Sequence, residues 1–149
     1  MDMLLEALTS LLTFESMLTV LIGVSAGLFI GAMPGLTATM ALAMLLPFTF
    51  SMEALQGLIA LGAVYMGSIY GGAFTAILIN TPGTPSSIAT TFDGYPMARQ
   101  GRAYEALAAA TIASVVGGIV GVIFLLILAP PLARLAVAFG PSEMFWVAM

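Results

Sequence analysis

Three long stretches of this chain contain no aspartate, glutamate, lysine or arginine: residues 16–52, 54–92 and 106–133. About 20 helical residues cross the hydrocarbon core of a bilayer, so each stretch can hold at least one crossing. The first two can each hold two crossings, or one crossing and a broken helix. The chain is 61% hydrophobic and only 7% charged, whereas soluble proteins carry roughly 25% charged residues. These features predict an all-α, polytopic membrane helix bundle.

The composition excludes several classes of function. Cysteine and histidine are absent, which removes disulfides, thiol nucleophiles, imidazole bases and the usual zinc or haem ligands. The carboxylates are few and dispersed, so we expect no enzyme active site. Three basic residues against seven acidic ones argue against nucleic acid as a partner. The first residues lack the positive region of a cleaved signal peptide, so the first span is expected to be retained.

Prolines and polar residues divide the charge-free stretches. Pro34 and Gly35 interrupt the first one, because proline lacks a backbone donor and disfavours helical geometry in the residue before it. A polar run at residues 80–87 interrupts the second, and Pro130 with Pro131 is expected to end the last span. The predicted segments are about 16–33, 37–50, 54–79 with a broken tip at 80–92, 105–128, and the start of a further helix at 142–149.

Two of these segments have a predicted place relative to the membrane. The segment 37–50 rises only about 22 Å, which is short for a crossing, so a discontinuous or re-entrant helix is expected there. The polar loop 93–102 holds two of the three arginines. The positive-inside rule therefore predicts that this loop is cytoplasmic. Residues 134–141 are expected to form a connector.

Glycines recur at four-residue spacing in three of the apolar segments. This spacing places them on one helix face, where the missing side chains let another backbone approach closely. A tightly packed bundle is therefore favoured, although chance is the alternative for any single pair in a chain with 16 glycines. The glycines concerned are Gly23, Gly27 and Gly31, then Gly67 and Gly71, then Gly117 and Gly121.

Residues 80–87, NTPGTPSS, form a polar and irregular segment between apolar neighbours. Irregular backbone is tolerated at membrane depth only inside protein or beside a wet cavity. Thr84 suits a helix N-cap with Pro85 in the first turn, which would leave the N–H groups of Ser86, Ser87 and Ile88 free. Such a helix start binds anions without lysine or arginine, and the carbonyl groups near Asn80 could hold a cation. A simple Pro-Gly turn at the membrane surface is the alternative.

The first break shows a related pattern 48 residues earlier. Pro34-Gly35 is followed by Thr37 and Thr39, much as Pro82-Gly83 is followed by hydroxyl residues, which suggests two facing broken helices. Asp93 lies close to the second break and is either an ion-coupling group or a turn residue. Tyr65 and Tyr70 either offer hydroxyls to a ligand or mark the membrane interface.

The chain carries two long and specific patterns, GxxPG at residues 31–35 and YGG…ILxNxPGTPSSxATxxDGYPMAxxG at residues 70–101. With them the chain closely resembles the large membrane subunit of the tripartite tricarboxylate transporters, the TctA family. The resemblance implies a bacterial inner-membrane secondary transporter with a two-fold repeat architecture. It implies import of carboxylates such as citrate with a Na⁺ or H⁺ gradient and no other cofactor. It also implies two partners, a small TctB-like membrane subunit and a periplasmic TctC-like solute-binding protein.

The resemblance and the two breaks together assign candidate site residues. The substrate-binding candidates are Asn80, Pro82, Gly83, Thr84, Pro85, Ser86 and Ser87. The ion-coupling candidates are Pro34, Gly35, Thr37, Thr39, Thr90 and Asp93. Members of the family are about three times as long as this chain, so it is expected to match their N-terminal portion. A truncated or non-transporting membrane scaffold module is the alternative function.

Overall fold

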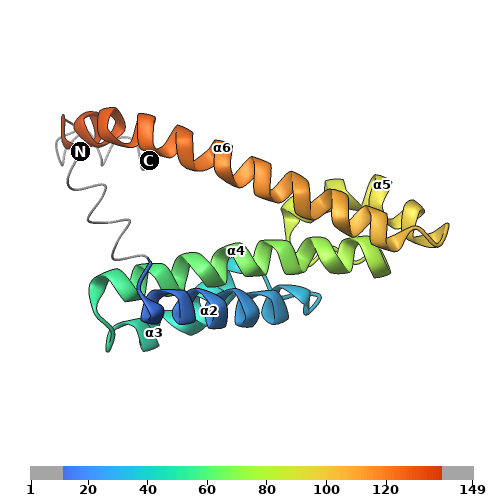
Figure 1. The fold of residues 1–149 in the computed structure, drawn as a ribbon, viewed down its shortest axis with the longest axis horizontal. Helices are drawn as coiled ribbons and strands as arrows, with labels where there is room; N and C mark the ends of the chain where they lie inside the picture. The colour runs from blue at the N-terminus through green and yellow to red at the C-terminus, as the bar shows by residue number, and fades with distance from the viewer. Residues whose placement is uncertain (1–11, 139–149) are drawn as a thin grey trace, which may run out of the picture. The chain divides into compact units, whose positions relative to one another are not determined.

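The computed structural model describes residues 12–138, with side chains for residues 12–133. Every regular element in this part of the chain is a helix (Figure 1). The elements are α2 (Phe14–Ala32), α3 (Ala38–Thr49), α4 (Ala54–Ile79), the short 3-10 helix η1 (Pro85–Ser87), α5 (Ile88–Arg99) and α6 (Ala103–Ala138). Residues 1–111 and 112–149 form two separate compact units, and each is described by itself. The helix predicted to start at 142–149 lies outside the described residues.

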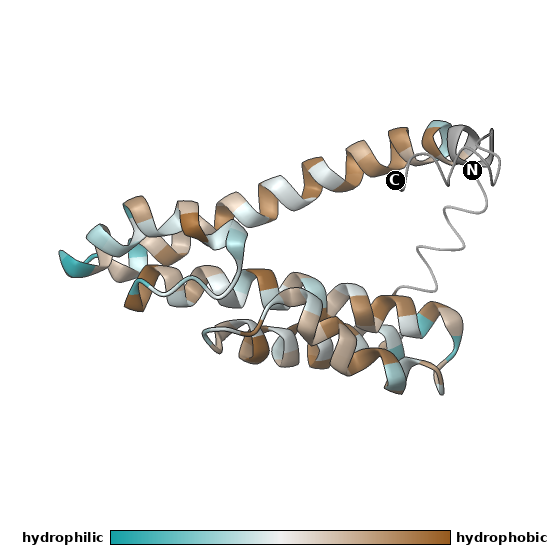
Figure 2. Ribbon diagram, turned by 180° about the vertical axis from the view of Figure 1, so that it is seen from behind, coloured by the Kyte–Doolittle hydropathy of each residue, from teal (hydrophilic) through white to brown (hydrophobic). Residues whose placement is uncertain are grey.

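Three of the described helices are long and apolar enough to cross a membrane: α2, α4 and α6. This confirms the expectation of an all-α protein with several candidate spans. Figure 2 shows hydrophobic residues along these helices and a hydrophilic turn between α5 and α6. At that turn, Arg102 donates hydrogen bonds to both carboxylate oxygens of Glu105. These two charged side chains are thus paired where α6 begins.

Helices α2 and α4 pack together along faces of small residues (Figure 1). A methyl group added to Gly27 would lie 2.9 Å from the Val64 Cα atom, and one on Gly31 would lie 2.6 Å from the Ser68 Cα atom. The contacting numbers rise together along both helices, so α2 and α4 run parallel. Gly67 packs in the same way against the backbone of α2. Helices α2 and α4 therefore approach each other closely at the first two glycine sets.

A methyl group added to Gly117 or Gly121, the third glycine set, would have no described atom within 4 Å beyond the adjoining backbone of its own helix. Both residues belong to the second unit, whose described part is α6 from Ile112 onward. No residue between 112 and 133 is buried. Close packing at this third set is therefore not seen within residues 12–138.

Each break is followed by a helix of 12 residues, α3 after the first and α5 after the second. At the first break the backbone turns through Gly35 with φ +87°, and the Thr37 hydroxyl caps α3 by accepting from the Met40 N–H. At the second, α4 ends at Asn80 in the left-handed conformation, φ 56°, which asparagine adopts more readily than most residues. The two halves of the first unit thus share one plan: a long helix, a Pro-Gly break and a short helix.

The structure corrects the prediction that residues 93–102 form a loop. Helix α5 continues through Asp93 to Arg99, and only residues 100–102 form the turn, with Gly101 at φ +80°. A methyl group on Gly94 would lie 2.7 Å from the Ile77 Cγ1 atom. The helix therefore persists because Gly94 lets it pack against α4, and Pro96 near its end removes only one backbone donor.

The end of the last helix is also corrected. Pro130 and Pro131 were expected to end the span predicted at 105–128, but α6 runs through both prolines to Ala138. Apolar helix-forming residues flank the pair, and helices of membrane proteins tolerate proline when local adjustment satisfies the freed carbonyl groups. Residues 134–138 of the expected connector are therefore helical.

The glycine face offers a test that uses a side-chain contact alone. A methyl group on Gly23 would lie 2.7 Å from the Ala63 Cβ atom. Gly23→Ala is expected to destabilise the complete subunit by about 1–3 kcal/mol through overpacking. Ala63→Gly in the same molecule removes the clashing atom and should restore most of that loss, as measured by thermal unfolding in detergent. A double variant as unstable as the sum of its single changes would contradict the register.

Candidate functional site

The second break is buried at its centre, at Gly83 and Thr84, and exposed at Asn80, Thr81, Pro85 and Ser86. The Gly83 N–H donates to the Gly72 carbonyl oxygen at 3.4 Å, and a methyl group on Gly83 would lie 2.9 Å from the Gly72 Cα atom and overlap the Gly31 carbonyl oxygen. Three glycines from α2, α4 and the break thus meet at one point. The centre of the irregular segment is therefore enclosed by protein, as irregular backbone at membrane depth requires.

The hydroxyl groups of the break form a small cluster. Thr84 Oγ1 lies 2.6 Å from Ser87 Oγ and 3.1 Å from Ser86 Oγ. Thr84 is 4% exposed and Ser87 is 2% exposed, whereas Ser86 is exposed. The cluster rests against Gly72, where an added methyl group would lie 3.0 Å from both Thr84 Oγ1 and Ser87 Oγ. Ser87 therefore supports Thr84 from behind, and Ser86 faces outward.

The backbone donors of the break differ in part from the prediction. Thr84 stands at the N-cap position before Pro85, but its hydroxyl makes no capping bond. The Ser87 N–H donates to the Thr84 carbonyl oxygen, and the Ile88 N–H donates to that of Pro85. The helix starts with a 3-10 turn, in which each N–H bonds the carbonyl group three residues earlier. The N–H groups of Ser87 and Ile88 are therefore already occupied. Within the described part of the chain, Ser86 alone of the three predicted donors has an N–H without an acceptor.

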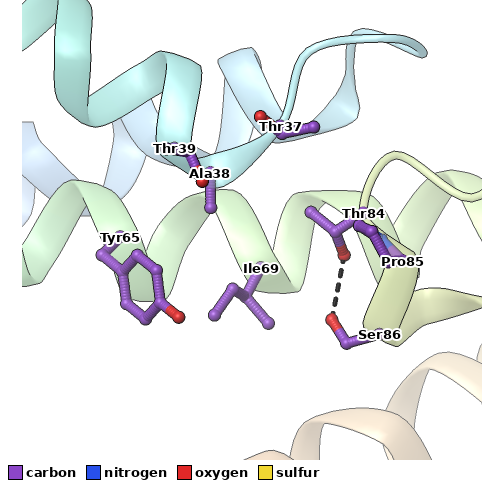
Figure 3. Close-up of a pocket in the computed structure, with 8 residues that line it drawn as sticks. All are labelled: Thr37, Ala38, Thr39, Tyr65, Ile69, Thr84, Pro85 and Ser86. Atoms are coloured by element: carbon purple, nitrogen blue, oxygen red, sulfur yellow. Dashed lines mark hydrogen bonds between the residues drawn. The ribbon is translucent and has the colours of Figure 1, made fainter. Parts of the chain in front are cut away.

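A cavity of about 320 Å³ lies where the two breaks meet. Figure 3 shows the start of α3 on one side, the residues around η1 on another, and two side chains of α4 between them. None of the described residues that line it is charged. The lining residues are Thr37, Ala38, Thr39, Tyr65, Ile69, Thr84, Pro85 and Ser86.

The cavity brings together only some of the predicted site residues. Thr84, Pro85 and Ser86 line it among the substrate-binding candidates, and Thr37 and Thr39 among the ion-coupling candidates. The candidates that do not line it are Asn80, Pro82, Gly83, Ser87, Pro34, Gly35, Thr90 and Asp93. Asp93 lies exposed on α5, and Gly83 and Ser87 are buried behind the cavity wall.

Sequence reasoning missed two lining residues, Ala38 and Ile69, and ranked Tyr65 below the break residues. Ala38 sits between the two predicted threonines, so its position follows once the start of α3 is placed. Tyr65 and Ile69 are four residues apart, which places them on one face of α4. The four-residue spacing could have shown that Tyr65 and Ile69 share a helix face. It does not show which other residues that face contacts.

The electrostatics of the cavity come from two helix starts. The first N–H groups of a helix have no partner within it, and the dipole places partial positive charge there. In α3 the Thr37 hydroxyl satisfies the Met40 N–H, so the N–H groups of Ala38 and Thr39 remain on the open first turn. The chain from Pro85 into α5 provides the second start. Both helix starts thus place partial positive charge beside the cavity without a cationic side chain.

These features define a helical membrane protein with an uncharged cavity, lined by hydroxyl and apolar groups, between two broken helices. The comparisons with known proteins identify the family. The model of the tripartite tricarboxylate transporter TctA family matches residues 17–149, and the chain belongs to this family, which comprises transporter components and not enzymes.

A curated relative matches most of the chain. The chain is 49% identical over 124 residues to an uncharacterized 52.8 kDa protein in the TAR-I ttuC' 3' region of Agrobacterium vitis. That match covers 83% of this chain and 25% of the relative, so the chain spans about a quarter of the protein that it matches. No solved structure matches the chain.

Proposed function

We propose that this chain is part of a membrane subunit that imports carboxylates such as citrate, and that the cavity between the breaks binds the substrate. The observation that carries the proposal is the convergence of two helix starts, at Thr37–Thr39 and Thr84–Ser86, on one cavity without charged lining residues. Helix starts bind carboxylate and phosphate through backbone N–H groups and the positive dipole end. The threonine and serine hydroxyls add further donors.

The absence of arginine and lysine from the described lining suits transport. A bidentate arginine–carboxylate pair forms strong, charge-assisted hydrogen bonds and would hold a substrate with several carboxylates tightly. Neutral donors and helix dipoles bind more weakly. A carrier needs this balance because it must release the substrate on the other side of the membrane.

The coupling cation, Na⁺ or H⁺, is assigned to a different part of the breaks. Thr37 and Thr39 lie at the positive start of α3, which disfavours a cation, so we assign them to the substrate and not to the ion. The carbonyl ends of α2 before Pro34 and of α4 before Asn80 carry partial negative charge. Broken helices of transporters hold cations at such ends. Thr90 and Asp93, on α5, have no part in this assignment.

We infer the wider assembly from the family. The complete subunit would work in the bacterial inner membrane with a small TctB-like membrane subunit and a periplasmic TctC-like binding protein. The turn between α5 and α6 would face the cytoplasm, because Arg99 precedes it and Arg102 lies in it, and positive charge is retained on that side. The remaining part of the subunit would supply a second set of broken helices.

Ser86→Ala tests the binding site. In the complete subunit, reconstituted with its partners, this change removes one exposed hydroxyl donor from the cavity. We expect the KM for carboxylate uptake to rise about tenfold, since a hydrogen bond to a charged group contributes about 1.5–3 kcal/mol. Uptake into proteoliposomes under an imposed Na⁺ or H⁺ gradient measures the change.

Ser25→Ala is the matched control. The Ser25 hydroxyl donates to the Leu21 carbonyl oxygen at 2.7 Å on the exposed side of α2, so its loss should leave the KM unchanged. Equal KM values for wild type, Ser25→Ala and Ser86→Ala would contradict the assignment of the cavity. No gradient-dependent uptake by the complete wild-type assembly would favour a scaffold function.

A further inference from the structure

Two tyrosines of α4 differ in how their hydroxyl groups are used. The Tyr70 hydroxyl lies 2.6 Å from Thr111 Oγ1 and is therefore partnered. Tyr65 lines the cavity, is 44% exposed, and its hydroxyl has no hydrogen-bond partner among the side chains of residues 12–133. The hydrocarbon core of a bilayer holds no water that could hydrogen-bond a polar group there. The partner of Tyr65 is therefore expected to be something that enters the cavity.

The position of Tyr65 along α4 argues against an interfacial role. Tyr65 is 11 residues from the start of α4 and 14 from its end, so it lies about 17 Å and about 21 Å from the two ends. Aromatic residues that anchor a helix lie at the membrane–water interfaces. Tyr65 is in the middle of a candidate span, at the depth of the cavity.

Tyr65 and the hydroxyl cluster lie at opposite ends of the cavity. The cluster rests on Gly72, seven residues after Tyr65, which is about 10 Å along the helix axis. Figure 3 shows the Ile69 side chain between the Tyr65 ring and Ser86. Thr39 of α3 borders the cavity on the side of Tyr65. The cavity thus has hydrogen-bonding groups at each end and an apolar floor between them.

We propose that Tyr65 is a specificity-determining residue, whose hydroxyl donates to a second polar group of a carboxylate bound at the Thr84–Ser86 end. This inference rests on the proposed function and adds the selection among anions. A ligand with oxygen acceptors at both ends of a short carbon chain satisfies both ends of the cavity. A monocarboxylate with an apolar tail leaves the phenol unpaired, and sites built to bond a polar group reject analogues that lack it.

The test compares two ligands of equal carbon number, succinate and butyrate, which have two carboxylates and one. Equilibrium binding is measured on the purified complete membrane complex without the soluble binding protein. The measured affinity then belongs to the membrane subunits alone. The wild type is expected to bind succinate at least about tenfold more tightly than butyrate. Tyr65→Phe removes only the hydroxyl and should reduce this ratio about tenfold by weakening succinate binding, while butyrate binding changes less than about twofold.

Tyr70→Phe is the matched control, because it removes a phenol hydroxyl that bonds Thr111 outside the cavity. Its succinate to butyrate ratio should equal that of the wild type. An unchanged ratio in Tyr65→Phe, or a wild type without preference for succinate, overturns the role of Tyr65. Weaker binding of both ligands in Ser86→Ala would still support the proposed function, whereas binding of neither ligand to the wild type overturns both proposals.

Discussion

Replacement of Gly31 by alanine is expected to cost the complete subunit about 3 kcal/mol or more of stability, at the upper end of the range for overpacking. The added methyl group would lie 2.6 Å from the Cα and carbonyl carbon atoms of Ser68 and still closer to its carbonyl oxygen. All three are backbone atoms, so no side chain can rotate away. Alanine favours a helix over glycine by about 1 kcal/mol, which offsets only part of the cost.

The effect should extend along the whole contact between α2 and α4. Gly27 meets the backbone of Val64 one turn earlier, so separating the helices at Gly31 also opens that contact. Thermal unfolding in detergent, followed by helix content, measures the loss. Gly62→Ala on α4 is the control, because no described atom lies within 4 Å of a methyl group there. A Gly31→Ala subunit as stable as Gly62→Ala would show that the two helices do not pack in this register.

The helices could be predicted because their causes are local. Charge-free apolar runs predict spans wherever they occur, and α2 (Phe14–Ala32) lies where residues 16–33 were predicted. The breaks followed from Pro34 and Asn80 to Ser87, because proline and irregular polar backbone interrupt a helix regardless of its surroundings. Helix α5 was missed because its course through Asp93 depends on the packing of Gly94 against Ile77, a contact between distant parts of the chain.

The cavity was harder to predict for the same reason. The similar patterns at Pro34 and Pro82 suggested facing breaks, but not that Thr37 and Ser86 line one cavity. The roles of the two serines depend on the 3-10 turn and on Gly72, which together bury Ser87 and leave Ser86 exposed. Tyr65 enters the site from a different helix, so no pattern within the break could identify it.

Gly72→Ala is expected to lower the kcat/KM for carboxylate uptake about a hundredfold, which is the scale of loss when site groups move by about 1 Å. The added methyl group would lie 2.9 Å from the Thr84 backbone nitrogen and 3.0 Å from the hydroxyl oxygens of Thr84 and Ser87. The break would have to move away from α4. Thr84 and Ser86 would then move relative to Thr37 and Thr39, and the two helix starts would no longer converge on one substrate.

This loss should occur with the helix packing preserved. Gly71 faces α2, whereas Gly72 faces the break, so a methyl group at Gly72 leaves the contact between α2 and α4 intact. The Gly72→Ala subunit should therefore unfold close to the wild-type temperature, well above Gly31→Ala, while its uptake falls. Gly62→Ala on the same helix should retain both properties. Uptake by Gly72→Ala at the wild-type rate would mean that the position of the break against α4 does not determine transport.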